Sequence, residues 1–133
     1  MNDNLVINGG VYYVKDNVIS LPPNDQREYH EQRRPVVILS GPDTNSDKDW
    51  RVVLVAPISS STSLKTSYCV KVNAGEANMS KKCWVRVVAV QPILKSDLGD
   101  RLGVLPSERL EEVQARIFQY MGLYPEDDSA LAL

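Results

Sequence analysis

Four side chains near the start of one apolar stretch are suited to chemistry on a phosphate: His30, Glu31, Arg33 and Arg34. They lead into the run 36–39 (VVIL), which the residues 40–42 (SGP) end. An imidazole exchanges protons near neutral pH, and guanidinium groups bind phosphate oxygens. A rigid strand that carries these groups therefore indicates chemistry on a phosphate. The alternative is a solvated loop that leads into a core strand, which is common in globular proteins.

Two further stretches carry polar groups that could contact an anion. The run 57–63 (PISSSTS) is either a flexible loop or a row of hydroxyl donors that holds a phosphate. Arg86 interrupts an apolar run, so its charged side chain needs either a partner or access to solvent. One interpretation is that Arg86 lies at the edge of the sheet and faces solvent. Together with Arg86, the pair Lys81-Lys82 could form a positive face.

Several other chemistries lack their residues in this sequence. One histidine and two distant cysteines make no zinc site, and we find no Gly-rich phosphate loop and no Gly-x-Ser-x-Gly element. We therefore expect no metal and no cofactor. The net charge of −2 argues weakly against nucleic acid, but without the segment 124–133 the chain has 15 basic and 14 acidic residues.

Length and composition indicate one ordinary globular domain. The chain has 133 residues, of which 43% are apolar and 24% are charged. No apolar run approaches the roughly 20 residues that span a bilayer, and the start (MNDNL) lacks the features of a signal peptide. Two cysteines fit a reducing compartment, so we expect a cytoplasmic location and no membrane partner.

The elements that must position these residues are short strands and one helix. β-Formers between turn signals predict strands at 11–14, 18–21, 34–40, 50–56, 67–72, 82–90 and 101–105. The hairpin between 67–72 and 82–90, centred near Glu76, would place Cys69 opposite Cys83, both reduced. No helical pattern alternates with the strands, so the sequence predicts a mainly β, small antiparallel barrel. The segments 22–32 and 41–49 are expected to be loops, and 93–99 is expected to be irregular or a short helical turn.

A C-terminal helix follows the last predicted strand. It is expected to begin at Pro106-Ser107, with Ser107 or a neighbour as the cap, and to end at Gly122. One face is apolar and is expected to pack on the sheet or on a second subunit; it carries Leu110, Val113, Ile117, Tyr120 and Met121. We expect one domain over 1–123 and a disordered acidic tail over 124–133.

The order of these segments resembles the PemK/MazF family of toxins from toxin–antitoxin pairs. Four segments carry the resemblance, roughly between Gly10 and Leu123: 10–14 (GVYYV), 30–40 (HEQRRPVVILS), 55–60 (VAPISS), and 103–105 (GVL) with the following helix. The resemblance implies an SH3-like barrel with a C-terminal helix, usually a homodimer. It also implies a metal-independent, sequence-specific endoribonuclease on single-stranded RNA, inhibited by a cognate antitoxin, with DNA contact only through the toxin–antitoxin complex.

The resemblance also implies roles for individual residues. Arg34 matches the family's Arg-Pro pair, Ser59 stands where many members have a catalytic Thr, and His30 matches a histidine near the scissile phosphate. Glu31 would orient His30 or act as the base, and the further RNA contacts would come from Arg33, Ser60, Ser61, Lys82 and Arg86. One branch uses an Arg as acid and an Asp two residues later as base; if Arg86 is that Arg, Val88 takes the place of the Asp. The alternatives are a non-catalytic binding module, such as a topoisomerase poison, and an inactive toxin.

Overall fold

The computed structural model describes residues 5–22, 32–63 and 65–124. In these ranges the strands are β1 (Gly10–Lys15), β2 (Arg33–Ile38), β3 (Val52–Ser59), β4 (Val70–Val72), β5 (Cys83–Val85), β6 (Gln91–Leu94) and β7 (Arg101–Val104). The α-helices are α1 (Pro42–Ser46) and α2 (Ser107–Tyr120). Four short 3₁₀ helices are η1 (Asp16–Val18), η2 (Glu76–Asn78), η3 (Val87–Ala89) and η4 (Lys95–Asp97).

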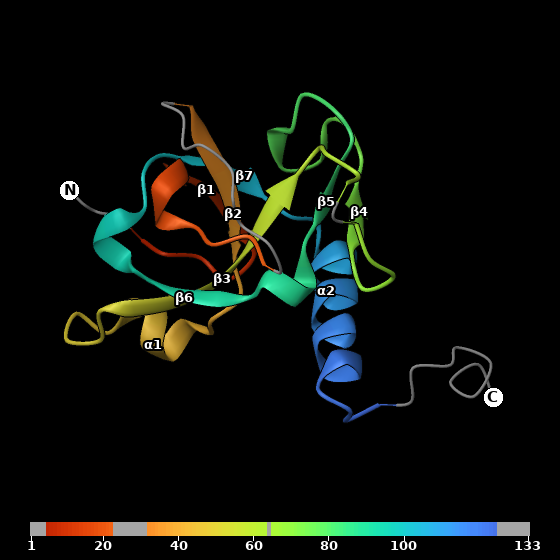
Figure 1. The fold of residues 1–133 in the computed structure, drawn as a ribbon. Coiled ribbons are helices and arrows are strands. Elements are labelled where there is room, and N and C mark those ends of the chain that lie inside the picture. Colours follow the sequence, from red (N-terminus) through yellow and green to blue (C-terminus); the bar gives the residue numbers. More distant parts are fainter. Residues whose placement is uncertain (1–4, 23–31, 64, 125–133) are drawn as a thin grey trace.

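The strands form one curled antiparallel sheet in the order β4-β5-β3-β2-β1-β7, with β6 paired to β3 beside this path. Figure 1 shows the sheet bent into a half-barrel, with α2 beside β4 and β5. Every strand pair is antiparallel, as expected for short strands joined without crossover helices. The prediction of a mainly β fold with one C-terminal helix is confirmed.

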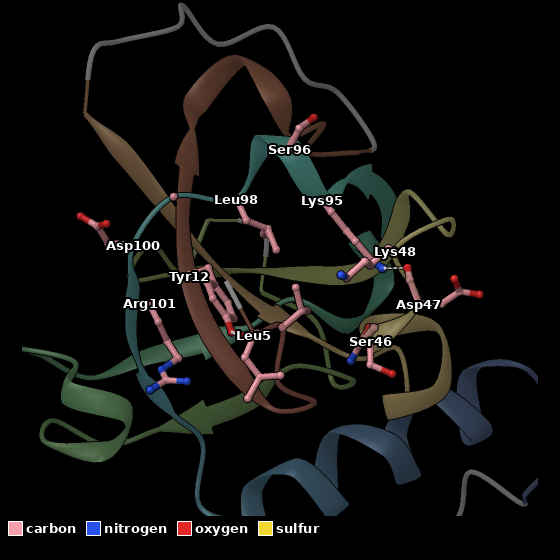
Figure 2. Close-up of a pocket in the computed structure, with 13 residues that line it drawn as sticks. Leu5, Tyr12, Ser46, Asp47, Lys48, Lys95, Ser96, Leu98, Asp100 and Arg101 are labelled. Atoms are coloured by element: carbon pink, nitrogen blue, oxygen red, sulfur yellow. Dashed lines mark hydrogen bonds between the residues drawn. The ribbon is translucent and has the colours of Figure 1, made fainter. Parts of the chain in front are cut away.

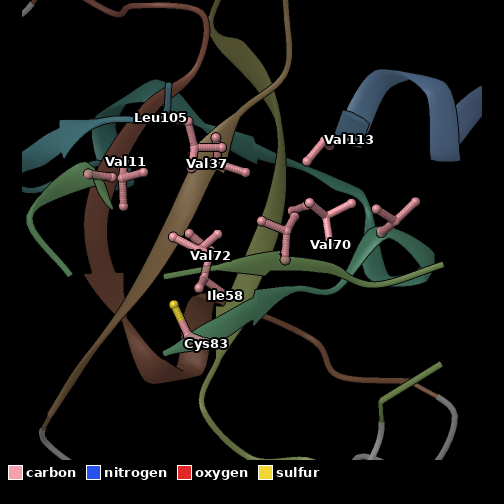
Figure 3. Packing of buried hydrophobic residues seen from close by; sticks show 12 residues of the cluster. Val11, Val37, Ile58, Val70, Val72, Cys83, Leu105 and Val113 are labelled. Atoms are coloured by element: carbon pink, nitrogen blue, oxygen red, sulfur yellow. The ribbon is translucent and has the colours of Figure 1, made fainter. Parts of the chain in front are cut away.

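The apolar run in β2 is continuous because both faces of the sheet are covered. Val37 packs in a core cluster that also contains Val113 of α2 (Figure 3), whereas Val36 and Ile38 point into a second cluster with Val14. Successive side chains of a strand alternate between the two faces, so a strand buried on both sides is apolar throughout. This burial fixes β2 and therefore the residues at its entrance.

Helix α2 differs in detail from its prediction. The N-cap residue is Pro106, the neighbour of Ser107, and no side chain caps the helix. Val113 is fully buried, but Tyr120 and Met121 are 52% and 64% exposed, so the end of the apolar stripe is not buried on this chain, and of the two expected partners only a second subunit is left for it. Gly122 follows with φ +83, a conformation that favours glycine, as predicted. Neither described α-helix is long and apolar enough to cross a membrane.

Several predicted strands are shorter or absent. The segment 18–21 is not a strand, because the chain turns through η1 directly after β1. The run 82–90 divides into β5 and η3, and β6 follows where an irregular segment was expected. Within the predicted loop 41–49, a short helix forms instead, with Pro42 in its first turn.

The two cysteines are free, but they do not lie opposite each other. Cys83 pairs with Val72 in the β4–β5 ladder, so the predicted register is wrong. The cause is the connection, in which Ala77 and Asn78 adopt positive φ and shift the centre of the hairpin. Burial raises the pKa of the Cys83 thiol to about 11, so this thiol is protonated at neutral pH and is no candidate nucleophile.

An ion pair between Glu76 and Arg109 ties the β4–β5 connection to α2. The Glu76 carboxylate accepts hydrogen bonds from the backbone N–H of Asn73 (2.8 Å) and from Arg109 Nε (3.1 Å). The Asn73 hydrogen bond is the main cause that lowers the pKa of Glu76 below its ordinary value of 4.5; burial opposes it, and the hydrogen bond and charge of Arg109 lower the pKa further.

We expect Glu76→Gln to reduce the dependence of stability on acid pH. The lowered pKa means that the charged carboxylate stabilises the fold above about pH 4.5, and that this contribution is lost as the pH falls through the folded-state pKa. Urea unfolding between pH 3 and 7 should therefore show a shallower acid decline in the variant, whereas Glu111→Gln, on the exposed face of α2, should follow wild type. Equal declines in wild type and Glu76→Gln would contradict this assignment.

Candidate functional site

Arg34 is held at the entrance of β2 by a buried carboxylate. The β1–β2 register places Arg34 opposite Val14, close to where η1 begins with Asp16. Arg34 Nε lies 3.0 Å from Asp16 Oδ1, and the two side chains are 15% and 0% exposed. Among the residues that the structure describes, the terminal nitrogens Nη1 and Nη2 donate to no acceptor. The ion pair therefore fixes the Arg34 guanidinium through Nε, and Nη1 and Nη2 stay available to bind an anion.

Ser59 is the last residue of β3. The β2–β3 ladder ends with the pair Val36–Pro57, and the same antiparallel register extended by two residues would set Arg34 opposite Ser59. Directly opposite residues of an antiparallel pair point to the same face. Ser59 Oγ accepts a hydrogen bond from Ser61 N–H (3.1 Å), so its own proton can be donated elsewhere. From this extended register we expect a guanidinium and a hydroxyl on one face, an arrangement that can bind a phosphate.

Arg86 lies behind this pair rather than at the surface. Its backbone N–H donates to Pro57 O (2.8 Å), its Nη2 donates to Pro22 O (3.0 Å), and the residue is only 3% exposed. The interpretation of Arg86 as an edge residue facing solvent is wrong, because its guanidinium enters the fold to bind a carbonyl oxygen. This burial argues against direct contact with RNA and indicates that Arg86 positions the chain at Pro22.

His30 and Glu31 lie outside the described residues, as does most of the predicted loop 22–32. Two described residues near the ends of this gap have a defined position. Pro22, which precedes it, is bound by Arg86, and Arg33 begins β2 just after it. The roles of His30 and Glu31 remain predictions.

The other predicted RNA contacts are exposed but not all on one face. Arg33 alternates with Arg34 along β2, so its side chain leaves the opposite face of the strand. Ser60 and Ser61 are exposed just after β3, and Lys82 Nζ lies 5.6 Å from the centre of the Trp84 ring. Val88, at the position considered for an Asp, lies in η3 and is half-buried.

Sequence reasoning missed Asp16, because an Asp followed by an Asn indicates no more than a turn. Its carboxylate is completely buried, and a buried acid requires a charged or hydrogen-bonding partner. The signal in the sequence was an acidic residue directly after a strand that is buried on both faces. The pairing itself became visible only with the β1–β2 register.

A hollow of about 1060 Å³ lies elsewhere on the molecule (Figure 2), between the N-terminal segment, α1 and the β6–β7 connection. It contains none of the predicted site residues. The Lys95 ammonium there donates to Thr44 O (2.7 Å) and Asp47 O (2.9 Å), so it holds the end of α1 in place. Lys48 and Arg101 are balanced by Asp47 and Asp100 in the same lining, and this mixture of charges does not single out an anionic ligand.

Comparisons with known proteins identify the family and the fold. The family model described as "PemK-like, MazF-like toxin of type II toxin-antitoxin system" matches residues 15–121. A comparison with curated protein sequences finds no match.

Several solved structures share the fold. An endoribonuclease in complex with its cognate antitoxin from Mycobacterial species is 16% identical, with a TM-score of 0.66 over 91% of this chain and 97% of that one. A MazE–MazF complex from Deinococcus radiodurans is 17% identical, with a TM-score of 0.68 over 92% and 100%. A MazF toxin from Mycobacterium tuberculosis is 20% identical, with a TM-score of 0.65 over 86% and 98%. At these identities the likeness shows the fold alone.

Proposed function

Because the chain belongs to the PemK-like, MazF-like toxins of type II toxin–antitoxin systems, a family of endoribonucleases, we propose that it cleaves single-stranded RNA at a short specific sequence without a metal ion. The observation that carries the proposal is the ion pair with buried Asp16, which fixes the Arg34 guanidinium on the face that the extended β2–β3 register would give to Ser59. A cognate antitoxin would inhibit this activity by covering the same face.

The reaction is attack of a ribose 2′-oxygen on the adjacent phosphorus. A 2′-O–P bond forms and the P–O5′ bond breaks, which leaves a 2′,3′-cyclic phosphate and a 5′-hydroxyl. The 2′-hydroxyl proton must pass to a base, and the leaving 5′-oxygen must receive a proton. The Nη1 and Nη2 atoms of Arg34 and the hydroxyl of Ser59 stabilise the charge that develops on the non-bridging oxygens.

His30 and Glu31 complete this proposal as the proton-transfer groups. Both precede Arg33 and Arg34 of β2 by only a few residues in the sequence. We assign His30 as the group that accepts or returns a proton, and Glu31 as its orienting carboxylate or as the base itself. Val88 cannot exchange a proton, so the base is not expected from that position.

The test is RNA cleavage by the purified protein in EDTA. A long single-stranded RNA should be cut at one short recurring sequence, and the products should carry cyclic phosphate and 5′-hydroxyl ends. Cleavage that needs an added divalent cation, or products with 5′-phosphate ends, would contradict the mechanism. Intact RNA together with tight binding to a protein target would instead favour the non-catalytic binding module.

A homodimer is part of the proposal, and the outer face of β3 and β6 is the surface we assign to it. Val52, Leu54 and Leu94 are 38%, 39% and 45% exposed, and Val52 pairs directly with Leu94. Charges of both signs lie next to this face in the segment 47–51 (DKDWR). A two-fold contact needs a self-complementary surface, which an apolar centre with mixed charges provides.

We expect Leu54→Glu to convert the dimer into a monomer. The two-fold axis places the new carboxylate in both halves of an apolar interface, so the dimer dissociation constant should rise by about 100-fold or more. Light scattering after size exclusion measures the change. Val104→Glu on β7, where the side chain is 46% exposed, is the matched control and should stay dimeric. A dimeric Leu54→Glu protein would rule out this face as the interface.

A further inference from the structure

A row of three side chains crosses the sheet beside the candidate site. Trp84 of β5 pairs with Ser59 of β3 on one side and with Lys71 of β4 on the other. Their neighbours Ile58, Val85 and Val70 are buried in the core, so the row points to the opposite, outer face. Trp84 therefore presents a half-buried indole next to the hydroxyl that we assign to the phosphate.

Lysines surround this indole. Lys65 Nζ lies 4.8 Å and Lys82 Nζ lies 5.6 Å from the centre of the Trp84 ring, and Lys71 is its cross-strand neighbour. In the described part of the chain, none of these three lysines forms a salt bridge. The surface thus combines one aromatic ring with three ammonium groups that no carboxylate balances. Unpaired nucleotides have the matching chemistry, because each offers a base to stack and a phosphate to pair.

Resting on the proposed function, we infer that Trp84 is the stacking platform for one unpaired base of the RNA, next to the phosphate that Ser59 contacts. Lys65, Lys71 and Lys82 bind the phosphates on either side of that base. This assignment places Lys82, already predicted to contact RNA, next to Trp84. It also adds Trp84, Lys65 and Lys71 to the proposed RNA-binding site.

The lysines now over the ring do not prevent stacking. An exposed ammonium above this half-buried surface indole is held weakly, and a nucleobase stacks on the same ring more strongly. A base can therefore displace one ammonium, which then pairs with the adjacent phosphate at little cost. If the lysines only shielded the ring from water, RNA would leave Trp84 unaffected.

The first experiment measures binding without cleavage. A short mixed-sequence RNA carrying 2′-O-methyl groups is titrated into Trp50→Phe protein, so that Trp84 is the only fluorophore of its kind. We expect the fluorescence of Trp84 to be quenched when RNA binds, and we expect Trp84→Leu to bind RNA about tenfold more weakly than Trp84→Phe.

The lysines are tested through the salt dependence of binding. Each of Lys71→Gln and Lys82→Gln should reduce the slope of log Kd against log salt concentration by about 0.7. Absence of quenching with unchanged Kd in Trp84→Leu would overturn the inference.

The second experiment separates this subsite from the catalytic proposal. With cleavable RNA, Trp84→Leu should raise KM by about tenfold and change kcat much less, because a remote base contact acts mainly on binding. Trp50→Leu, at a position just before the opposite end of β3, is the control.

If wild type cleaves but Trp84→Leu keeps the wild-type KM, the subsite is wrong and the proposed function stands. If wild type does not cleave but the binding results hold, the subsite stands and the proposed function fails. Unchanged RNA binding with loss of antitoxin binding would overturn the inference in favour of a protein surface.

Discussion

Replacing Arg34 with alanine is expected to lower the rate constant for RNA cleavage by about 10²–10³-fold, the usual effect of losing a donor that stabilises developing negative charge. The structure gives the physical reason. Asp16 holds Nε at 3.0 Å, so the two terminal nitrogens are oriented before the substrate arrives. No reorganisation is then needed as charge grows on the phosphate oxygens. Single-turnover cleavage in EDTA with saturating protein measures this effect directly.

Arg34→Lys is the informative companion to this variant. Lysine keeps the positive charge but loses the planar fork and the Nε–H that binds Asp16, so activity should remain well below wild type. Thermal melts must show that both variants are folded at the assay temperature, because Arg34→Ala leaves Asp16 buried without this partner. Cleavage by folded Arg34→Ala within a few-fold of wild type would count decisively against the proposed role.

Replacing Asp16 with alanine should cost about 3–5 kcal/mol of stability, the usual penalty for removing one partner of a buried ion pair. The Asp16 side chain is completely buried and its partner is 15% exposed, so solvent screens the interaction little. For a chain of this size the loss corresponds to a fall in Tm of roughly 10–20 °C. Cleavage by the remaining folded protein should also slow, because Arg34 loses the group that orients it.

A double-mutant cycle distinguishes this pair from general damage at the site. If Asp16 and Arg34 act together, the double variant will be less destabilised than the two single changes predict, because removing both leaves no isolated charge. Asp49→Ala, at an exposed position, is the control and should change stability by at most about 0.5 kcal/mol. Additive effects of Asp16→Ala and Arg34→Ala would contradict the proposed coupling.

Parts of the fold were predictable because their signals are local. The run 36–38 consists of β-branched residues, since β2 is covered on both faces, and α2 shows its helical spacing directly. The hairpin register was not predictable in this way. It depends on positive φ at two successive residues, Ala77 and Asn78, of which alanine rarely adopts this conformation.

The candidate site was predictable only where residue type and family resemblance coincide. Arg34 and Ser59 were named from the sequence, and the β2–β3 ladder ends two residues short of a pair between them. The partners that position the site lie far away along the chain. Asp16 is 18 residues from Arg34, and Pro22 is 64 residues from Arg86. Such pairs follow from sheet topology, which no local pattern reveals.

The proposed mechanism is tested most directly through its nucleophile, the ribose 2′-oxygen. Once the cleaved sequence is mapped, a short RNA with a single 2′-deoxynucleotide on the 5′ side of the scissile phosphate is compared with the all-RNA oligonucleotide in EDTA. If the 2′-oxygen is the nucleophile, the all-RNA strand is cut, and the substituted strand binds equally well but stays intact. Cleavage of the substituted strand at the same bond would show that water, not the 2′-hydroxyl, attacks, and would contradict the central claim.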